Sequence, residues 1–242
     1  MVVGVGGFLR CCEDIHIMVK IGNASIGSNG KISGDKAGDQ NGKEVCIRDW
    51  YSKPWTHVIR FKREDMRKKN AECMIKACNN NHIGYNQLRR NTLLQYAANV
   101  GFDPSKVDKV CDTDCSSLVS LCAIYAGVPQ GVMYQYGNSC TTANLRNRLN
   151  KTGLVNIMTD KAYTTKPDKL MIGDILLAEG KHVAIVVQTD EAMNIAPDKD
   201  VHEVALEIID GKWGVGAERK RRLIQAGYDF MTVQAEVNRI LK

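Results

Sequence analysis

The chain has 242 residues, of which 44% are hydrophobic and 25% are charged, and its formal net charge is +6. This composition is typical of a globular protein and argues against a chain that is disordered throughout. Every apolar run is shorter than the roughly 18 to 20 residues of a membrane-spanning helix, so we predict no membrane insertion.

The N-terminal residues 1–17 start with an apolar run that is followed by charged residues and two cysteines, without the small-residue cleavage site of a signal peptide. The sequence from Met18 onward reads as a more natural beginning. We therefore expect residues 1–17 to be an extension that takes no part in the fold.

The nine cysteines are an odd number, in a chain too large to need disulfide bonds for stability. They favour synthesis in a reducing, cytosolic compartment. The pairs Cys73 with Cys78 and Cys111 with Cys115 have nearly the spacing of zinc ligands, but they lack the tighter paired knuckles of structural zinc sites. We predict no metal site and no cofactor.

The segment from Lys53 to Arg90 is basic, with ten Lys or Arg residues against three acidic ones. Such a segment can attract a polyanion, either an anionic cell-wall polymer or a nucleic acid, or it can simply be a solvated helix face. Since it has no recognised reading motif and few interleaved aromatic residues, we do not predict a nucleic-acid partner.

Residues 22–42 are rich in Gly, Ser, Asn and Asp, which predicts a loop that contributes little core and holds no more than short strands. The helical spacing of apolar residues predicts amphipathic helices over 64–78 and 88–100. A strongly apolar helix is predicted from about Asp114 to Tyr125, ending at Gly127.

A further short helix is predicted over 141–149, and β-branched, alternating residues predict hairpin strands at 174–177 and 182–188. Because helices precede strands in this order, we expect an α+β domain with N-terminal helices and a C-terminal antiparallel sheet over 18–190. Residues 191–202 resemble a linker. Three helical segments within 203–242 predict a small three-helix bundle.

Cys115 stands at the start of the third helix, where unpaired N–H groups and the helix dipole favour a thiolate. Asp114 precedes it as a candidate helix cap. His182 begins a predicted strand and is the histidine best placed to take the thiol proton and return it to a leaving amine. We therefore predict a cysteine–histidine catalytic pair.

Three motifs occur in a fixed order: DCSSLV at residues 114–119, GDIL at 173–176 and HVAIV at 182–186. This succession resembles the NlpC-type papain-like cysteine peptidases and the related bacteriophage peptidoglycan amidases. The resemblance implies a papain-like domain in which Cys115 is the nucleophile and His182 is the base.

The same resemblance implies a polar residue that orients the histidine, and two candidates remain open. Asn194 lies about a dozen positions after His182, as in that family, whereas Gln40 could orient the histidine or supply a donor to the oxyanion. Tyr85 is expected beside the cysteine, as a functional residue or as a packed core residue.

The C-terminal segment contains GKWGVG at 211–216, AGYD at 226–229 and VQAEVN at 233–238, which are similar to the CW-seven cell-wall-binding repeat of phage lysins. Such lysins usually carry an asparagine where Val215 stands here. The resemblance implies binding to peptidoglycan, with Trp213 and Tyr228 stacking on a sugar and Arg219 pairing with a carboxylate. Both aromatic residues could instead fill the core of the bundle.

Together these resemblances imply a phage or prophage endolysin that cuts an amide bond of peptidoglycan, as an N-acetylmuramoyl-L-alanine amidase or a stem-peptide endopeptidase. Its location would be the host cytoplasm before release and the cell wall afterwards. A catalytically inactive wall-binding protein is the alternative, with a basic nucleic-acid-binding protein less favoured. The sequence predicts no oligomeric state.

Overall fold

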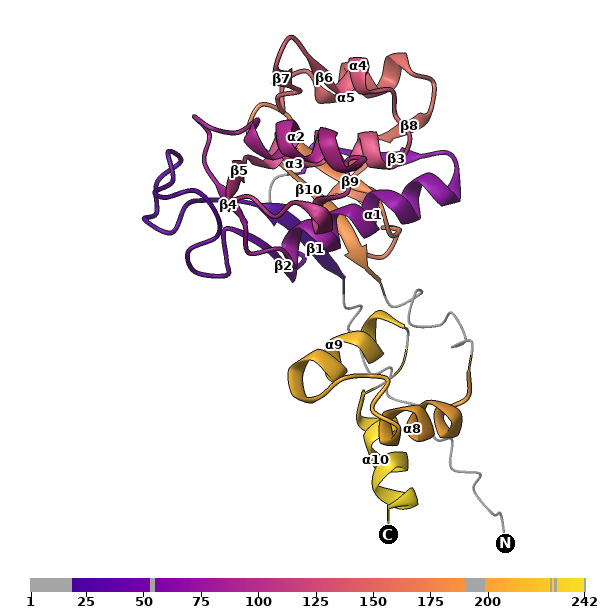
Figure 1. Ribbon diagram of the computed structural model, residues 1–242. Helices are drawn as coiled ribbons and strands as arrows, with labels where there is room; N and C mark the ends of the chain where they lie inside the picture. Colours follow the sequence, from indigo (N-terminus) through magenta and orange to yellow (C-terminus); the bar gives the residue numbers. More distant parts are fainter. Residues whose placement is uncertain (1–18, 53–54, 190–198, 227, 229, 242) are drawn as a thin grey trace, which may run out of the picture.

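A computed structural model describes residues 19–52, 55–189, 199–226, 228 and 230–241 (Figure 1). The expected extension 1–17 and most of the expected linker lie outside the described residues. The described part forms a larger α+β unit that ends at Thr189 and a helical unit that begins at Lys199.

Within the described residues, six strands form an antiparallel sheet in the order β2-β1-β10-β9-β3-β8. β10 lies inside this sheet, between β1 and β9. The strands are β1 (Lys20–Ala24), β2 (Val45–Asp49), β3 (His57–Phe61), β8 (Val155–Met158), β9 (Ile175–Ala178) and β10 (His182–Gln188).

The predicted strands at 174–177 and 182–188 are confirmed as the hairpin β9–β10. Alternate residues of β10 enter two different cores. Val183 and Ile185 belong to the main core between sheet and helices, whereas Ala184 and Val186 belong to a smaller core on the opposite face. A strand buried on both faces is continuously apolar, and this apolar run is why the strand could be predicted from sequence.

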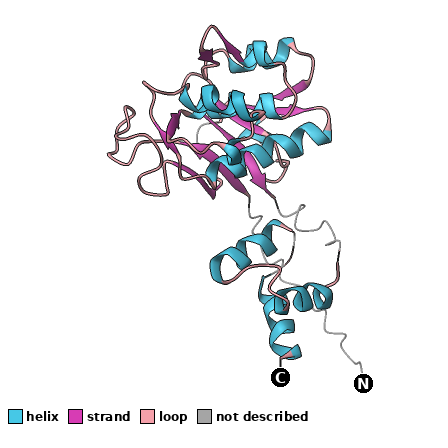
Figure 2. Cartoon of the chain, viewed as in Figure 1, coloured by secondary structure: helices cyan, strands magenta, loops and turns pink. Residues whose placement is uncertain are grey.

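The predicted α+β class is confirmed by the mixture of helices and strands (Figure 2). The expected order, with helices before strands, is wrong, because β1, β2 and β3 all precede the first helix. The expectation that residues 22–42 contribute little core is also wrong at its start, since Asn23 and Ala24 are buried. β1 contains few apolar residues of its own. It is held by pairing with β10 and β2, and such long-range pairing leaves no local sequence pattern.

Two predicted helices are confirmed: α1 (Glu64–Cys78) and α3 (Cys115–Tyr125), which pack against each other and against β10. α2 (Thr92–Ala97) is shorter than the predicted helix 88–100. Its start is delayed because the Asn86 side chain accepts the N–H groups of Leu88 and Arg89 in a turn, which leaves Leu88 84% exposed. A 3-10 turn, Ala98–Val100, continues it.

α5 (Leu145–Lys151) begins later than the predicted helix 141–149, because the Asn144 side chain accepts the Thr141 N–H in a turn before the helix. The remaining elements of the larger unit are short. They are α4 (Gln130–Met133), α6 (Lys161–Thr164), a 3-10 turn at Pro104–Lys106, the parallel pair β4 (Ile83–Tyr85) and β5 (Cys111–Thr113), and the hairpin β6 (Tyr134–Gln135) and β7 (Asn138–Ser139).

The helical unit consists, in its described residues, of α8 (Val201–Ile209), α9 (Gly216–Gln225) and α10 (Phe230–Ile240), around a core of its own. α8 begins two residues before position 203, because Asp200 caps it by accepting the Glu203 N–H. The Tyr228 hydroxyl group accepts the Lys199 N–H and donates to the Lys199 carbonyl oxygen. The unit therefore includes Lys199.

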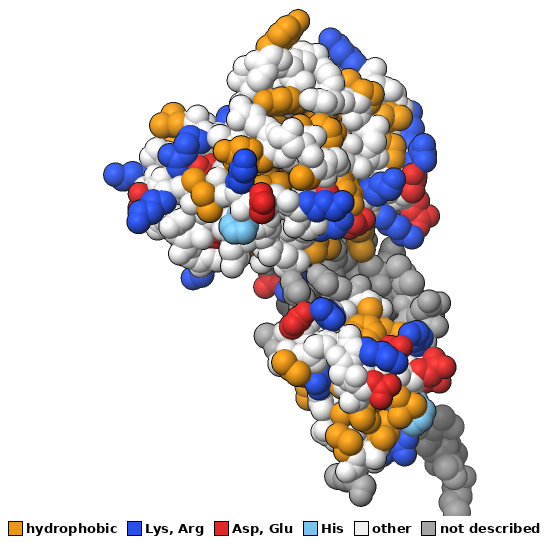
Figure 3. All heavy atoms as spheres, viewed as in Figure 1, with side chains coloured by type: hydrophobic (Ala, Val, Ile, Leu, Met, Phe, Trp, Pro, Cys, Tyr) orange, Lys and Arg blue, Asp and Glu red, His pale blue; other side chains and the backbone are white. Residues whose placement is uncertain are grey.

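On the face drawn in Figure 3, Lys and Arg side chains are scattered, and acidic side chains lie among them. Several of these cations have acidic partners, including Lys68 with Glu64 and Lys76 with Glu72 along α1. Every helix in the described ranges is too short or too polar to cross a membrane.

Candidate functional site

Cys115 is the first residue of α3 and follows directly on β5 through Asp114. The Asp114 carboxylate caps the helix, as expected, by accepting the Ser117 N–H at 2.7 Å. β5 pairs with β4 so that Tyr85 stands opposite Thr113. This pairing places the upstream tyrosine strand beside the segment that leads to the cysteine.

Burial, together with the neighbouring Asp114 carboxylate, raises the pKa of the Cys115 thiol to about 12. Backbone N–H groups of Val183 and Ser116 oppose this shift, but the residue is only 7% exposed. The expected lowering of the thiol pKa at the helix N-terminus is therefore outweighed by burial. At neutral pH the side chain rests as a thiol.

His182 is the first residue of β10, and the N–H group of the next residue, Val183, is directed to the Cys115 sulfur. The start of β10 therefore meets the start of α3. The His182 ring stacks on Trp55 with ring centroids 6.0 Å apart. Burial and the charge of Arg48 lower the pKa of His182, so the imidazole is neutral at neutral pH.

Tyr85 is buried close to the cysteine, and its hydroxyl group accepts a hydrogen bond from Gln87 at 3.0 Å. Burial and the nearby Cys115 and Asp114 raise the pKa of Tyr85 to about 12, which keeps the hydroxyl group protonated as a donor. Tyr51 also lies close enough for Cys115 to raise its pKa, although burial is the larger cause.

Gln40 lies on an exposed turn, where its side-chain amide donates to the carbonyl oxygens of Ala37 and Gly38 at 3.1 and 2.8 Å. These bonds hold the turn that contains Gln40. Asn194 lies outside the described residues. Of the two candidates for orienting His182, the structure therefore describes only Gln40, whose side chain bonds its own turn. The residue that stacks on His182 is Trp55.

Arg90 is a residue of this site that sequence reasoning missed. Its guanidinium group pairs with Asp114 at 2.6 Å and donates to the Ser116 hydroxyl group at 2.8 Å and to the Cys140 carbonyl oxygen. Arg90 thus connects the first turn of α3 with Cys140, the residue that follows β7. It looks in sequence like one more cation of the basic segment, so spacing offered no signal for this role.

The histidine partner Trp55 was missed for a similar reason. Its indole N–H donates to the Tyr51 carbonyl oxygen at 2.8 Å, and the Tyr51 and Trp55 rings lie 5.3 Å apart. Both residues come from the segment between β2 and β3, which has no catalytic motif. Within the described residues, no cluster of three or more His, Cys, Asp or Glu side chains could hold a metal ion.

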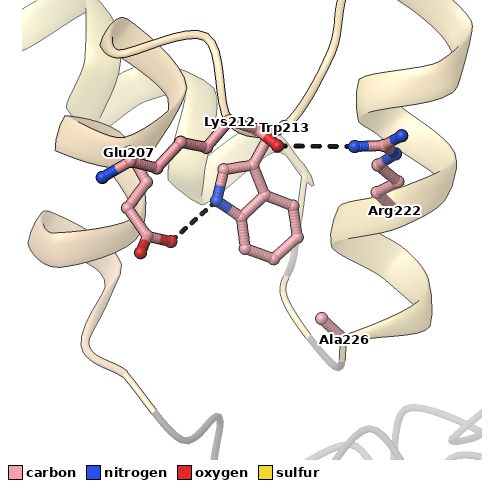
Figure 4. A pocket seen from close by; sticks show the side chains of 5 residues that line it. All are labelled: Glu207, Lys212, Trp213, Arg222 and Ala226. Atoms are coloured by element: carbon pink, nitrogen blue, oxygen red, sulfur yellow. Dashed lines mark hydrogen bonds between the residues drawn. The ribbon is translucent and has the colours of Figure 1, made fainter.

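The helical unit carries an open pocket of about 480 Å³ next to Trp213 (Figure 4). The half-buried Trp213 donates its indole N–H to Glu207 at 2.9 Å, and Lys212, Arg222 and Ala226 line the rest. Apart from Trp213, these lining residues were not anticipated. They carry charges of both signs around one aromatic ring.

The other two residues predicted to bind the wall have structural contacts. Tyr228 is only 4% exposed, packs edge-on against Trp213, and bonds the backbone of Lys199. Tyr228 therefore fills the core of the helical unit, which is one of the two roles that the sequence left open for it. Arg219 donates to the Gly214 carbonyl oxygen at 3.0 Å and so holds the turn before α9.

Comparison with known families gives two matches. Residues 21–193 match an endolysin-like domain, and residues 202–241 match the CW_7 repeat. No curated protein and no solved structure matches the chain. Since the first match covers most of the chain, the protein belongs to the endolysin-like domain family and carries a CW_7 cell-wall repeat at its C-terminus.

Proposed function

We propose that this endolysin-like protein hydrolyses an amide bond of peptidoglycan, with Cys115 as the nucleophile and His182 as the base. The observation that carries the proposal is the hydrogen bond from the Val183 N–H group to the Cys115 sulfur, because Val183 follows directly after His182 in β10. The family match and the cell-wall repeat independently indicate peptidoglycan as the substrate. The NlpC-type motifs support a papain-like mechanism.

The uncharged resting pair determines how the reaction begins. As the sulfur attacks the carbonyl carbon, His182 takes the thiol proton and the carbonyl oxygen becomes an oxyanion. The protonated Tyr85 hydroxyl group is suited to donate to that oxygen. His182 then gives its proton to the leaving amine, and a thioacyl-enzyme remains.

The second half of the reaction releases the acyl group. His182, neutral again, takes a proton from a water molecule that attacks the thioester carbon, and the sulfur leaves and recovers the proton. A neutral imidazole is required at the start of both halves. The lowered pKa of His182 keeps it available for both. Asn194 and Gln40 stay predictions as residues that assist it.

The pocket beside Trp213 is proposed to bind the glycan and peptide of the wall. An aromatic ring offers a surface for a sugar face, while Lys212 and Arg222 offer donors to carboxylates. Anchoring by this unit raises the local concentration of substrate for the catalytic unit without adding catalytic contacts. We place the protein in the bacterial cytoplasm before release and at the wall afterwards, as in a phage lysin.

The proposed reaction is tested by digesting purified Gram-positive sacculi with the wild type and with Cys115→Ala, and identifying the new termini by mass spectrometry. We expect the variant to lose at least about 10³-fold in rate, because no other group replaces the nucleophile. A new free alanine amino group at the start of the stem indicates an amidase, and an internal terminus indicates an endopeptidase.

A matched control is Cys46→Ser, which removes a half-buried thiol from β2 and should leave the rate nearly unchanged. If Cys115→Ala digests sacculi as fast as the wild type, the assignment of the nucleophile is wrong. If the folded wild type binds sacculi but releases no fragment, the protein is an inactive wall-binding protein instead.

A further inference from the structure

Arg48 stands on the same face of the sheet as the stacked His182 and Trp55. In β2 it is paired with Ile21 of β1, and cross-strand partners point to the same face. Ile21 belongs to the smaller core that also contains Trp55, Ala184 and Val186. His182 is two residues before Ala184 in β10, so it shares this face as well.

A row of rings connects Arg48 with His182. The Arg48 guanidinium carbon lies 5.4 Å from the centroid of the Tyr51 ring. The Tyr51 and Trp55 rings are 5.3 Å apart, and the Trp55 and His182 rings are 6.0 Å apart. Two aromatic rings, Tyr51 and Trp55, therefore connect the arginine with the histidine through successive contacts.

Arg48 differs from the other arginines near the cysteine in its partners. Arg89 pairs with Asp112, and Arg90 pairs with Asp114, each at 2.6 Å. Arg48 is exposed, and no carboxylate of the described residues pairs with it. A guanidinium group oriented by an aromatic ring and left without an acid is suited to bind a carboxylate from outside the protein.

We propose that Arg48, with Tyr51 and Trp55, forms a subsite that binds a free carboxylate of the substrate's peptide stem. The inference rests on the proposed function, and it makes Arg48 a determinant of specificity. The stem would lie across the partly exposed Tyr51, which packs on the buried Trp55, with its carboxylate at Arg48 and its scissile amide at Cys115. An amide in place of that carboxylate would lose the charged hydrogen bonds.

Binding at this subsite would also affect the base. The charged groups that act on His182 include Arg48 on β2 and Asp114 before α3, and Tyr51 in turn lies near both Arg48 and Cys115. Arg48 lowers the pKa of His182, whereas Asp114 raises it. A bound carboxylate offsets the charge of Arg48, so substrate binding would make His182 a stronger base.

The test compares the wild type with Arg48→Gln on a soluble disaccharide–peptide fragment of peptidoglycan, in one form with free stem carboxylates and in another with carboxamides. We expect the wild type to prefer the free acid by roughly tenfold in kcat/KM, the effect of one or two charged hydrogen bonds at a partly solvated site. In Arg48→Gln, the ratio of kcat/KM on the free acid to kcat/KM on the carboxamide should fall to about one.

Arg63→Gln is the matched control, because it removes the same charge from an exposed arginine that pairs with Asp65 before α1. It should keep the wild-type preference. A second readout is the acid limb of kcat/KM against pH, which should move to higher pH in Arg48→Gln and stay in place in the control.

Equal rates of the wild type on both forms, together with unchanged rates in Arg48→Gln, would overturn the subsite and leave the proposed function standing. If the wild type cleaves neither form, the proposed function fails and the subsite fails with it. A loss of rate on both forms by the same factor in Arg48→Gln would also contradict a carboxylate subsite.

Discussion

Cys115 and His182 both rest uncharged, because burial disfavours charge on each of them. A helix N-terminus beside a histidine would favour a thiolate–imidazolium pair, but burial here favours the neutral pair. In the proposed mechanism the proton therefore moves during attack on the substrate and not before it. This distinction has a consequence for the dependence of the rate on pH.

We predict that kcat/KM falls on the acid side with an apparent pKa below 6.5, the ordinary value for histidine, since His182 must be neutral to act as base. On the alkaline side, the thiol should produce no limb between about pH 7 and 9, because its pKa is raised to about 12. Initial rates on a soluble peptidoglycan fragment measure this profile. An acid limb above pH 7 would contradict a neutral, buried His182.

A second prediction at this scale concerns Arg90, which pairs with Asp114 while the two side chains are 16% and 10% exposed. Arg90→Ala should destabilise the fold by about 3 kcal/mol, because it leaves a buried carboxylate without its cation. It should also lower kcat, because Asp114 caps the helix that carries Cys115. Urea unfolding and initial rates are the measurements.

Arg63→Ala serves as the comparison, since that side chain is 70% exposed and should leave the unfolding midpoint nearly unchanged. If Arg90→Ala unfolds at the same urea concentration as Arg63→Ala, the Arg90–Asp114 pair contributes nothing to stability.

At the scale of elements, the GDIL turn before β9 is held against α1. The Asn70 amide donates to the Gly173 carbonyl oxygen at 3.0 Å. A Cβ at Gly173 would overlap the backbone of Arg67 in α1, and the φ angle there is +84°. This glycine therefore permits close contact between α1 and the turn that leads into the β9–β10 hairpin.

We predict that Gly173→Ala destabilises the protein more than Gly153→Ala. Both glycines have positive φ, but a Cβ at Gly153 meets nothing within 4 Å, so that variant measures backbone strain alone, about 1 to 2 kcal/mol. Overlap with Arg67 should add roughly 2 kcal/mol at Gly173. Thermal or urea unfolding measures both, and equal losses would show that close packing at Gly173 is unimportant.

The elements also show what can be predicted from sequence. α1, α3 and the β9–β10 hairpin carry their own apolar patterns, and these were predicted nearly to the residue. β1 has no such pattern because β10, about 160 residues away in the chain, holds it in place. The start of α2 depends on one side chain, Asn86, which periodicity does not capture.

The site follows the same rule. Cys115 and His182 lie in motifs, so they could be proposed from sequence. Trp55 and Arg90 act through contacts across the fold, and their residue types are ordinary in the segments that contain them. The thiol pKa was also not predictable, because the effect of a helix N-terminus is visible in sequence while the depth of burial is not.

At the scale of the whole molecule, the chain divides into a unit with the proposed catalytic pair and a unit with the cell-wall repeat. Each has its own core. We therefore predict that a chain ending at residue 198, which keeps the whole matched domain and Asn194, stays folded and cleaves soluble fragments at the wild-type rate. Its binding to sacculi in a pull-down should fall, and so should its rate on intact sacculi.

Undiminished binding of the shortened chain would show that the repeat is not the anchor. A full-length Trp213→Phe variant is a milder comparison, since it keeps an aromatic ring beside the pocket but removes the indole N–H that bonds Glu207. Trp213→Phe should bind sacculi more weakly than the wild type but more tightly than the shortened chain.

The position of β10 inside the sheet has a consequence for synthesis. β10 carries the proposed base, yet it is the last strand of its unit to be made and must insert between β9 and the first strand, β1. Contacts so distant in the chain form late in folding and slow it. At about 5 to 20 residues per second, a ribosome spends seconds making this unit before the base exists. Chains that end before residue 182 therefore lack both an inner strand of the sheet and the proposed base.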